Sequence, residues 1–192
     1  LASRRWQDGA LREDTGRALI DCSSNDYLGL SQHPLVKERA AQWARDHGAG
    51  APASRLVTGT RDITTAVEHK LAAFKGCEAA LVFPSGFQTN TTAIPALAAL
   101  GETLIFSDGL NHSSLVHGCR LAKARTVVFR HNDLAHLDEL LQQHADFTGR
   151  RLIVTETVFS MDGDRAPLAG LRDLAQIHGA ALYVDEAHAT GV

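Results

Sequence analysis

From about residue 79 onward, short apolar runs alternate with segments of helical spacing. The apolar runs, rich in β-branched or aromatic residues, predict strands at residues 80–83, 103–106, 126–129, 152–154 and 181–184. The segments between most of them predict helices at residues 89–100, 113–122, 134–144 and 168–178. This alternation predicts an α/β fold in three α/β/α layers, with a mostly parallel sheet covered by helices on both faces. In such sheets, ligands bind where the strands reach their carboxyl ends.

The composition is that of a globular protein, with 192 residues of which 44% are hydrophobic and 21% charged. A formal net charge of −3 gives no reason to expect nucleic acid or an anionic membrane as partner. The three cysteines, Cys22, Cys77 and Cys119, form no CxxC pair, which argues against a disulfide framework and favours a cytoplasmic location. No apolar run approaches the roughly 20 residues that span a bilayer, and we expect no secretory signal.

The first quarter of the chain is less regular. Residues 1–21 are polar and Arg-rich and predict an arm that ends in a short strand at 18–21, while residues 33–47 have helical spacing. The segment 48–59 has Gly at both ends, which can bring a backbone close to a ligand, and a further helix is predicted at 65–74. We therefore expect an arm with its first helix over residues 1–47 and the start of a large ligand-binding domain over 48–192. Because the chain starts without Met and stops just after a predicted strand, we expect a fragment of a longer protein.

Polar turns follow four of the predicted strands. Gly86 would expose backbone N–H groups at a helix start, which suits an anion, although an ordinary start capped by serine is the simpler interpretation. His112 is either a cap or surface residue or an imidazole that stacks on an aromatic ligand. Asp185 ends a strand, where a carboxylate needs a cation or hydrogen-bond donors, and it could equally cap the next helix. Together, an anion site, a stacking imidazole and a carboxylate for a ring nitrogen describe what pyridoxal 5'-phosphate (PLP) requires.

The sequence contains no motif typical of a metal site, a serine hydrolase or a dinucleotide-binding site. Zinc is disfavoured because HExxH is absent, and the Asp-Gly-Asp sequence at 162–164 does not have EF-hand spacing, so no metal is expected. A serine hydrolase would have GxSxG, and a dinucleotide site would have GxGxxG between a strand and a helix. Neither sequence occurs in the required setting.

Six motifs, in this order, resemble the α-oxoamine synthase family over about residues 20–192. They are Asn25-Asp26-Tyr27-Leu28-Gly29-Leu30, Ser85-Gly86-Phe87, Asp108 with Asn111-His112-Ser113-Ser114, His131-Asn132-Asp133, Phe159-Ser160-Met161-Asp162-Gly163-Asp164 and Asp185-Glu186-Ala187-His188-Ala189-Thr190-Gly191. The resemblance implies the PLP-dependent transferase fold type I (aminotransferase class I/II), with residues 48–192 as the first part of the PLP-binding large domain. It also implies a homodimer with active sites at the subunit interface, acting on small-molecule substrates.

The resemblance implies that three residues contact the phosphate region or the ring face of the cofactor. Gly86 and Phe87 would contact the phosphate region, and His112 would stack on the pyridine ring and meet the substrate carboxylate. These contacts would anchor and orient the ring.

The same resemblance assigns the remaining cofactor contacts to three further residues. Asp185 would pair with the ring nitrogen, and His188 and Ser160 would hydrogen-bond the phenolic oxygen. Of all these residues, His112, Asp185 and His188 would be catalytic. Asp185 would stabilise an electron-rich intermediate by its charge.

The chemistry implied is a decarboxylative Claisen-type condensation of an amino acid with an acyl thioester. The Asp185–Gly191 motif is similar to the branch that uses L-alanine and pimeloyl-CoA or a pimeloyl carrier protein. Glycine C-acetyltransferase-like and 5-aminolevulinate synthase-like members remain alternatives. A different class of alternative is a non-catalytic partner subunit that lacks the PLP lysine.

Two features depart from the family pattern. The Gly-rich loop stands as Gly50-Ala51-Pro52-Ala53-Ser54-Arg55, and Thr64 occupies a position where the family often has His. The family's PLP lysine would lie beyond Val192, and the four lysines present are expected on helices away from the strand ends, namely Lys37, Lys70, Lys75 and Lys123. We therefore expect the 192-residue chain alone to have negligible synthase activity.

Overall fold

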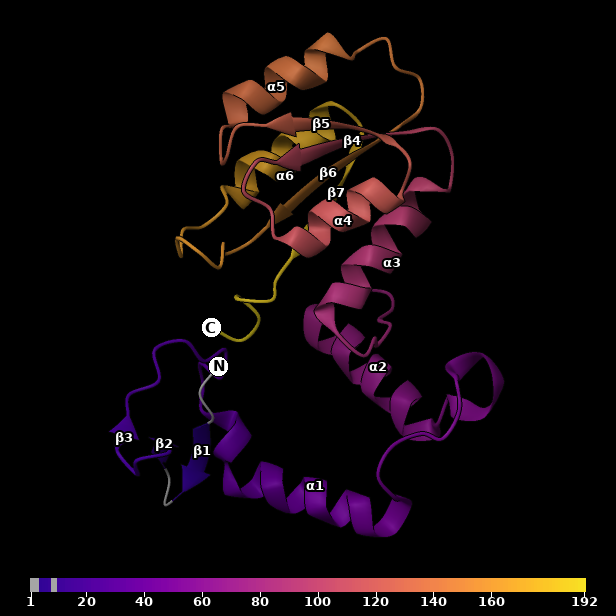
Figure 1. Cartoon of the computed structure of the whole chain (residues 1–192). Helices are drawn as coiled ribbons and strands as arrows, with labels where there is room; N and C mark the ends of the chain where they lie inside the picture. The colour runs from indigo at the N-terminus through magenta and orange to yellow at the C-terminus, as the bar shows by residue number, and fades with distance from the viewer. Residues whose placement is uncertain (1–3, 8–9) are drawn as a thin grey trace. The chain divides into compact units, whose positions relative to one another are not determined.

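The computed structural model describes residues 4–7 and 10–192 and divides into two compact units that meet in sequence at Gly50 and Ala51 (Figure 1). The first unit contains a small antiparallel sheet in the order β1-β2-β3, formed by β1 (Arg4–Gln7), β2 (Ala10–Glu13) and β3 (Ala18–Leu19). A short turn at η1 (Leu30–Gln32) precedes α1 (Pro34–His47), which begins on a proline and ends at Gly48 with φ of 81°. The strand predicted at 18–21 is confirmed at 18–19, and two strands before it were missed because their sequence is polar and Arg-rich.

The second unit is built on a parallel sheet in the order β5-β4-β6-β7. Its strands are β4 (Thr103–Asp108), β5 (Arg125–Phe129), β6 (Arg150–Glu156) and β7 (Ala180–Asp185). Its helices are α2 (Asp62–Lys75), α3 (Gly86–Ala98), α4 (Ser113–Leu121), α5 (Leu134–Gln143) and α6 (Leu168–Ile177), with a short π-helical turn at η2 (Arg55–Gly59). The predicted α/β order is confirmed from residue 103 onward.

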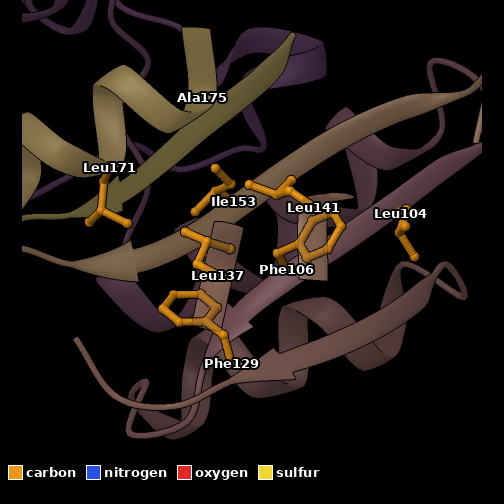
Figure 2. Packing of buried hydrophobic residues seen from close by; sticks show 8 residues of the cluster. All are labelled: Leu104, Phe106, Phe129, Leu137, Leu141, Ile153, Leu171 and Ala175. Carbon is orange, nitrogen blue, oxygen red and sulfur yellow. The ribbon is translucent and has the colours of Figure 1, made fainter. Parts of the chain in front are cut away.

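Alternate side chains of the central strands point to opposite faces of this sheet. Leu104 and Phe106 of β4 pack with α5 and α6, as does Ile153 of β6 (Figure 2). Ile105 of β4 instead packs with Leu115 of α4, in the cluster that also contains Ile94 of α3. Helices therefore cover both faces, as is usual for a parallel sheet (Figure 1).

One predicted strand, residues 80–83, is wrong. The segment pairs with no described strand, and side chains bond both backbone polar groups of Val82. Glu68 Oε1 accepts from the Val82 N–H at 2.8 Å, and Arg55 donates to the Val82 carbonyl at 3.0 Å. Arg55 and Glu68 also form an ion pair with each other, which ties the loop before α2 to this segment.

Gly59, which ends the segment 48–59, packs against protein backbone and does not leave room for a ligand. Gly59 is buried, and a Cβ there would collide with the backbone carbonyl of Ala53. Among the described residues, no helix is both long and apolar enough to cross a membrane.

The close approach of α3 and α4 depends on Gly118. A Cβ at this position would lie 2.5 Å from the Asn90 carbonyl oxygen and 2.9 Å from Ile94 Cδ1. Backbone cannot yield to such a contact, so the two helices would have to move apart.

We predict that Gly118→Ala lowers the free energy of unfolding by about 1–2 kcal/mol, measured by urea denaturation. The overpacking outweighs the roughly 1 kcal/mol that alanine contributes to a helix over glycine. Gly101→Ala is the matched control, because its Cβ would meet only Arg150 Cδ at 3.6 Å. A Gly118→Ala protein as stable as the Gly101→Ala protein would contradict the close packing of α3 and α4.

Candidate functional site

Three neighbouring strands each end in an acidic residue, at the side of the sheet where the carboxyl ends of the strands lie. Asp108 is the last residue of β4, Glu156 of β6 and Asp185 of β7. We call this side, together with the starts of α3 and α4, the carboxyl rim. It is where ligands bind in sheets of this kind.

Asp185 is held by donors from two sides. Its Oδ2 accepts from Asn90 Nδ2 at 2.7 Å, and its Oδ1 accepts from the Ala187 N–H at 2.8 Å. Asn90 lies on α3, is 4% exposed, and also donates from Nδ2 to Ser114 Oγ at 2.9 Å. The Tyr183 hydroxyl donates to Asn90 Oδ1 at 2.7 Å, so this buried amide meets α4 and β7 at once.

The carbonyl oxygen and charge of Asp185 influence its neighbours as well. The Thr157 N–H and Oγ1 both donate to the Asp185 carbonyl, at 2.9 and 3.0 Å. Burial, reinforced by the negative charge of Asp185, raises the pKa of Tyr183 to about 12. The Tyr183 hydroxyl therefore keeps its proton and remains a donor to Asn90 over the physiological range.

His112 occupies the N-cap of α4 and is exposed, with one side of its ring held by hydrogen bonds. Its Nδ1 accepts from the Ser114 N–H at 3.2 Å and lies 2.7 Å from Ser114 Oγ. A nitrogen that accepts from backbone carries no proton, so a neutral ring has its proton on Nε2. Through Ser114 and Asn90, the ring is linked to Asp185 by hydrogen bonds.

Glu156 is a buried carboxylate behind these groups. Its Oε1 accepts from the His112 N–H at 2.5 Å, and the residue is 3% exposed. Burial raises the pKa of Glu156, and the charge of Asp185 adds to the rise, while the His112 N–H opposes it. The rim thus concentrates negative charge that a bound cation would relieve.

The start of α3 presents backbone donors next to this network. Ser85 caps the helix, accepting from the Gln88 N–H at 3.2 Å, and Gly86 and Phe87 follow as its first residues. The first N–H groups of a helix have no acceptor within it, and they carry the positive end of the helix dipole. Apart from the two adjacent residues and the helix's own backbone, no atom lies within 4 Å of the position a Gly86 Cβ would take, so no other segment covers this position. It can receive an anion.

Ser160 and His188 lie on two different segments. Ser160 is exposed at the tip of the loop 157–166, whose base is the Thr157–Asp185 contact. His188 is partly buried in the turn after β7, close enough to Glu156 for its charge to lower the pKa of that carboxyl slightly. The structure thus joins His112 to Asp185 through hydrogen bonds, and it brings His188 near Glu156.

Sequence reasoning missed four members of this network. They are Asn90, Ser114, Glu156 and Tyr183. Glu156 could have been found, because it ends an apolar strand in the same way as Asp185 does. The signal for Asn90 is weaker, being a polar residue one turn after Gly86 on the buried side of α3.

The expectation about the lysines is wrong in two respects. Lys123 lies in the turn after α4, with φ of 55°, and not on a helix. Lys75, at the end of α2, forms an ion pair with Glu186 and approaches Thr190 Oγ1 at 3.4 Å. Both partners belong to the turn after β7, so this amino group is close to a strand end. In the part of the chain that the structure describes, no group of His, Cys, Asp and Glu side chains is arranged to hold a metal ion.

Comparison with known proteins adds the family. The sequence profile of the family "Aminotransferase class I and II" matches residues 17–192. A protein named 8-amino-7-oxononanoate synthase from Gluconacetobacter diazotrophicus is 57% identical over 183 residues, covering 92% of this chain and 46% of the relative. A protein of the same name from Geobacter sulfurreducens is 51% identical over 177 residues, covering 92% of this chain and 45% of the relative. The chain spans slightly less than half the length of these curated relatives.

Solved structures agree in fold. A serine palmitoyltransferase from Sphingomonas wittichii superposes with a TM-score of 0.84 at 37% identity, covering 89% of this chain and 42% of that chain. A serine palmitoyltransferase from S. paucimobilis with bound PLP gives 0.83 at 32% identity, covering 95% and 45%. An 8-amino-7-oxononanoate synthase from Francisella tularensis gives 0.67 at 28% identity, covering 88% and 45%.

The raised pKa of Glu156 leads to a prediction about stability and pH. A carboxyl whose folded pKa lies above its unfolded value near 4.5 favours folding while protonated, and this contribution is lost as the pH rises through the folded pKa. Glu156→Gln keeps an acceptor for the His112 N–H and removes the buried charge. We predict a higher denaturation midpoint than wild type at pH 7.5 and little difference at pH 4.5. A variant that is less stable than wild type at pH 7.5 would contradict this assignment.

Proposed function

Because the chain belongs to the class I and II aminotransferase family, we propose that it is part of a PLP-dependent α-oxoamine synthase, specifically an 8-amino-7-oxononanoate synthase. The sheet and helices of residues 51–191 have the architecture of PLP-dependent transferases. The reaction is the decarboxylative condensation of L-alanine with pimeloyl-CoA, or with a pimeloyl carrier protein, in biotin biosynthesis. The products are 8-amino-7-oxononanoate, CO2 and coenzyme A or the free carrier.

The observation that carries this proposal is the setting of Asp185. Each of its carboxylate oxygens takes one N–H donor, which leaves lone pairs for a further partner. A protonated pyridine nitrogen is such a partner, and its positive charge offsets the crowding of Asp185 with the buried Glu156. The residues of the carboxyl rim therefore fit PLP.

The other contacts follow from positions around Asp185. The open start of α3, at Gly86 and Phe87, receives the phosphate through backbone N–H groups. The ring of His112, oriented by Ser114, would stack on the cofactor and contact the substrate carboxylate. His188 and Ser160 donate to the phenolic oxygen.

When bound, PLP supplies the electron sink for carbon chemistry at the amino acid. The chain's own residues do the rest. Asp185 keeps a proton on the ring nitrogen by its charge, and Asn90 holds that carboxylate in position by a hydrogen bond. His112 orients the substrate and excludes water from one side of it.

The choice of substrates rests on the relatives' names. Two relatives more than 50% identical are named 8-amino-7-oxononanoate synthase, and the two serine palmitoyltransferase structures described above are 37% and 32% identical. We accordingly expect L-alanine and a pimeloyl thioester rather than glycine or serine with another acyl group. The natural protein is expected to be a cytoplasmic homodimer with its active site at the subunit interface.

The test uses the natural protein that contains this chain, supplied with PLP. Release of coenzyme A is measured for L-alanine with pimeloyl-CoA, glycine with acetyl-CoA, and L-serine with palmitoyl-CoA. The first pair should give the highest kcat/KM. Preference for either of the others would refute the specific assignment and leave the family intact.

We predict that Asp185→Asn lowers kcat for L-alanine and pimeloyl-CoA by about 100-fold or more, because the ring nitrogen loses its compensating charge. Asp138→Asn is the matched control. That carboxylate lies on α5 and pairs with His178 at 2.7 Å, away from the carboxyl rim. Equal turnover of the Asp185 and Asp138 variants would contradict the role of Asp185.

A further inference from the structure

A second cluster of ionisable groups lies beside the cofactor residues. His131, in the loop between β5 and α5, has a carboxylate at each ring nitrogen. Its Nδ1 lies 2.8 Å from Asp108 Oδ1, and its Nε2 lies 2.7 Å from Asp164 Oδ2. The function proposed above gives this cluster no role.

The geometry of the cluster favours a charged imidazole. A neutral imidazole has one N–H, whereas two carboxylate oxygens face the two nitrogens of His131. With both carboxyl groups ionised, both contacts are hydrogen bonds only when the ring is doubly protonated. Asn132 Nδ2 also lies 3.2 Å from His131 Nε2, but it is closer to Asp164 Oδ2, to which it donates at 2.7 Å. Asp108 is 2% exposed and is fixed by the N–H groups of Leu110 and Asn132, at 2.8 and 3.0 Å.

The surrounding charges favour that state. Burial by itself lowers the pKa of His131, but hydrogen bonds and charge from Asp108 and Asp164 outweigh it, and the pKa is raised. Asp108 comes from β4 and Asp164 from the loop 157–166. On the histidine's own loop, Arg130 is paired with Asp133 at 2.8 Å, and the Arg130 N–H donates to His136 Nδ1.

The loop that His131 holds is the one that carries Ser160. The loop folds back on itself, with the Phe159 N–H donating to the Asp164 carbonyl at 3.0 Å and the Gly163 N–H to the Phe159 carbonyl at 2.8 Å. Gly163 has φ of 71°, which suits this tight reversal. The rings of His131 and Phe159 are nearly perpendicular, with their centroids 4.4 Å apart.

His131 therefore touches both residues that bracket the loop tip, on either side of Ser160. Asn132 adds a further tie, because its Nδ2 donates to Asp164 Oδ2 at 2.7 Å. Since Asp164 has a half-exposed side chain, these contacts are what connect it to the buried Asp108.

We propose that His131 is a positioning residue, a charged clamp that joins Asp108 of β4 to Asp164 and thereby holds the loop that presents Ser160 to the cofactor. The inference rests on the proposed function only for what Ser160 does. The clamp itself is a property of this chain and can be measured without cofactor.

The clamp gives the loop a definite dependence on pH. The folded pKa of His131 is raised above its ordinary value of 6.5, so the contribution of the clamp is complete below that pH and is lost as the pH rises through the folded pKa. We predict that amide hydrogens of Phe159 and Gly163 exchange progressively faster over that rise, after correction for intrinsic exchange. Hydrogen–deuterium exchange of the natural protein without PLP measures this.

Two variants separate the clamp from general stability. His131→Gln should speed exchange of the loop about tenfold at pH 6.5, because the amide is uncharged and both of its N–H groups lie on one nitrogen, whereas the two carboxylates face two separate ring nitrogens. Asp164→Asn should keep the protection but abolish its dependence on pH, because the new amide can donate to a neutral His131 ring. His178→Gln is the matched control, since it removes a single His–Asp pair on α5 and α6.

Unchanged loop exchange in His131→Gln, or unchanged pH dependence in Asp164→Asn, would overturn the clamp. A loop that loosens equally in His178→Gln would overturn it as well, because the effect would then be global. If the clamp behaves as expected and the natural protein fails to bind PLP, the proposed function is what fails.

Discussion

A single buried amide, that of Asn90, connects the groups on which the candidate site depends. It donates to Asp185 and Ser114 and accepts from Tyr183. Its position therefore fixes the orientation of the Asp185 carboxylate and, through Ser114, that of the His112 ring. An amide can serve all three because it offers donors and an acceptor without a charge of its own. Its helix can supply it only because Gly118 lets α4 approach the Asn90 backbone closely.

The fold from residue 103 onward could be predicted from the sequence, because each strand there contains a short apolar run and the central strands β4 and β6 are largely buried. The same rule failed at residues 80–83, where the composition is that of a strand but Arg55 and Glu68 bond the backbone of Val82. A local pattern does not reveal a partner 14 or 27 residues away. The strands at 4–7 and 10–13 were missed for the opposite reason, since their charged side chains carry no alternating apolar signal.

For the site, the sequence indicated which strand ends matter, and the resemblance of its motifs indicated the family. The structure adds what holds those residues: Asn90 for Asp185, Ser114 and Glu156 for His112, and His131 for the loop of Ser160. These supporting groups come from different elements and meet only after the chain folds. The carboxylates of Glu156 and Asp185 repel each other at the carboxyl rim. A cationic ring nitrogen would relieve this repulsion.

The most direct test of this account is the affinity of the natural protein for PLP after Asn90→Ala, measured by absorbance titration and compared with Thr91→Ala on the neighbouring surface of α3. Removing the amide leaves Asp185 without its helix donor and the Tyr183 hydroxyl without its acceptor. The account predicts a dissociation constant about 10- to 100-fold higher for Asn90→Ala and unchanged for Thr91→Ala. Wild-type affinity for PLP in a folded Asn90→Ala protein would contradict the claim that this amide holds the Asp185 carboxylate in place.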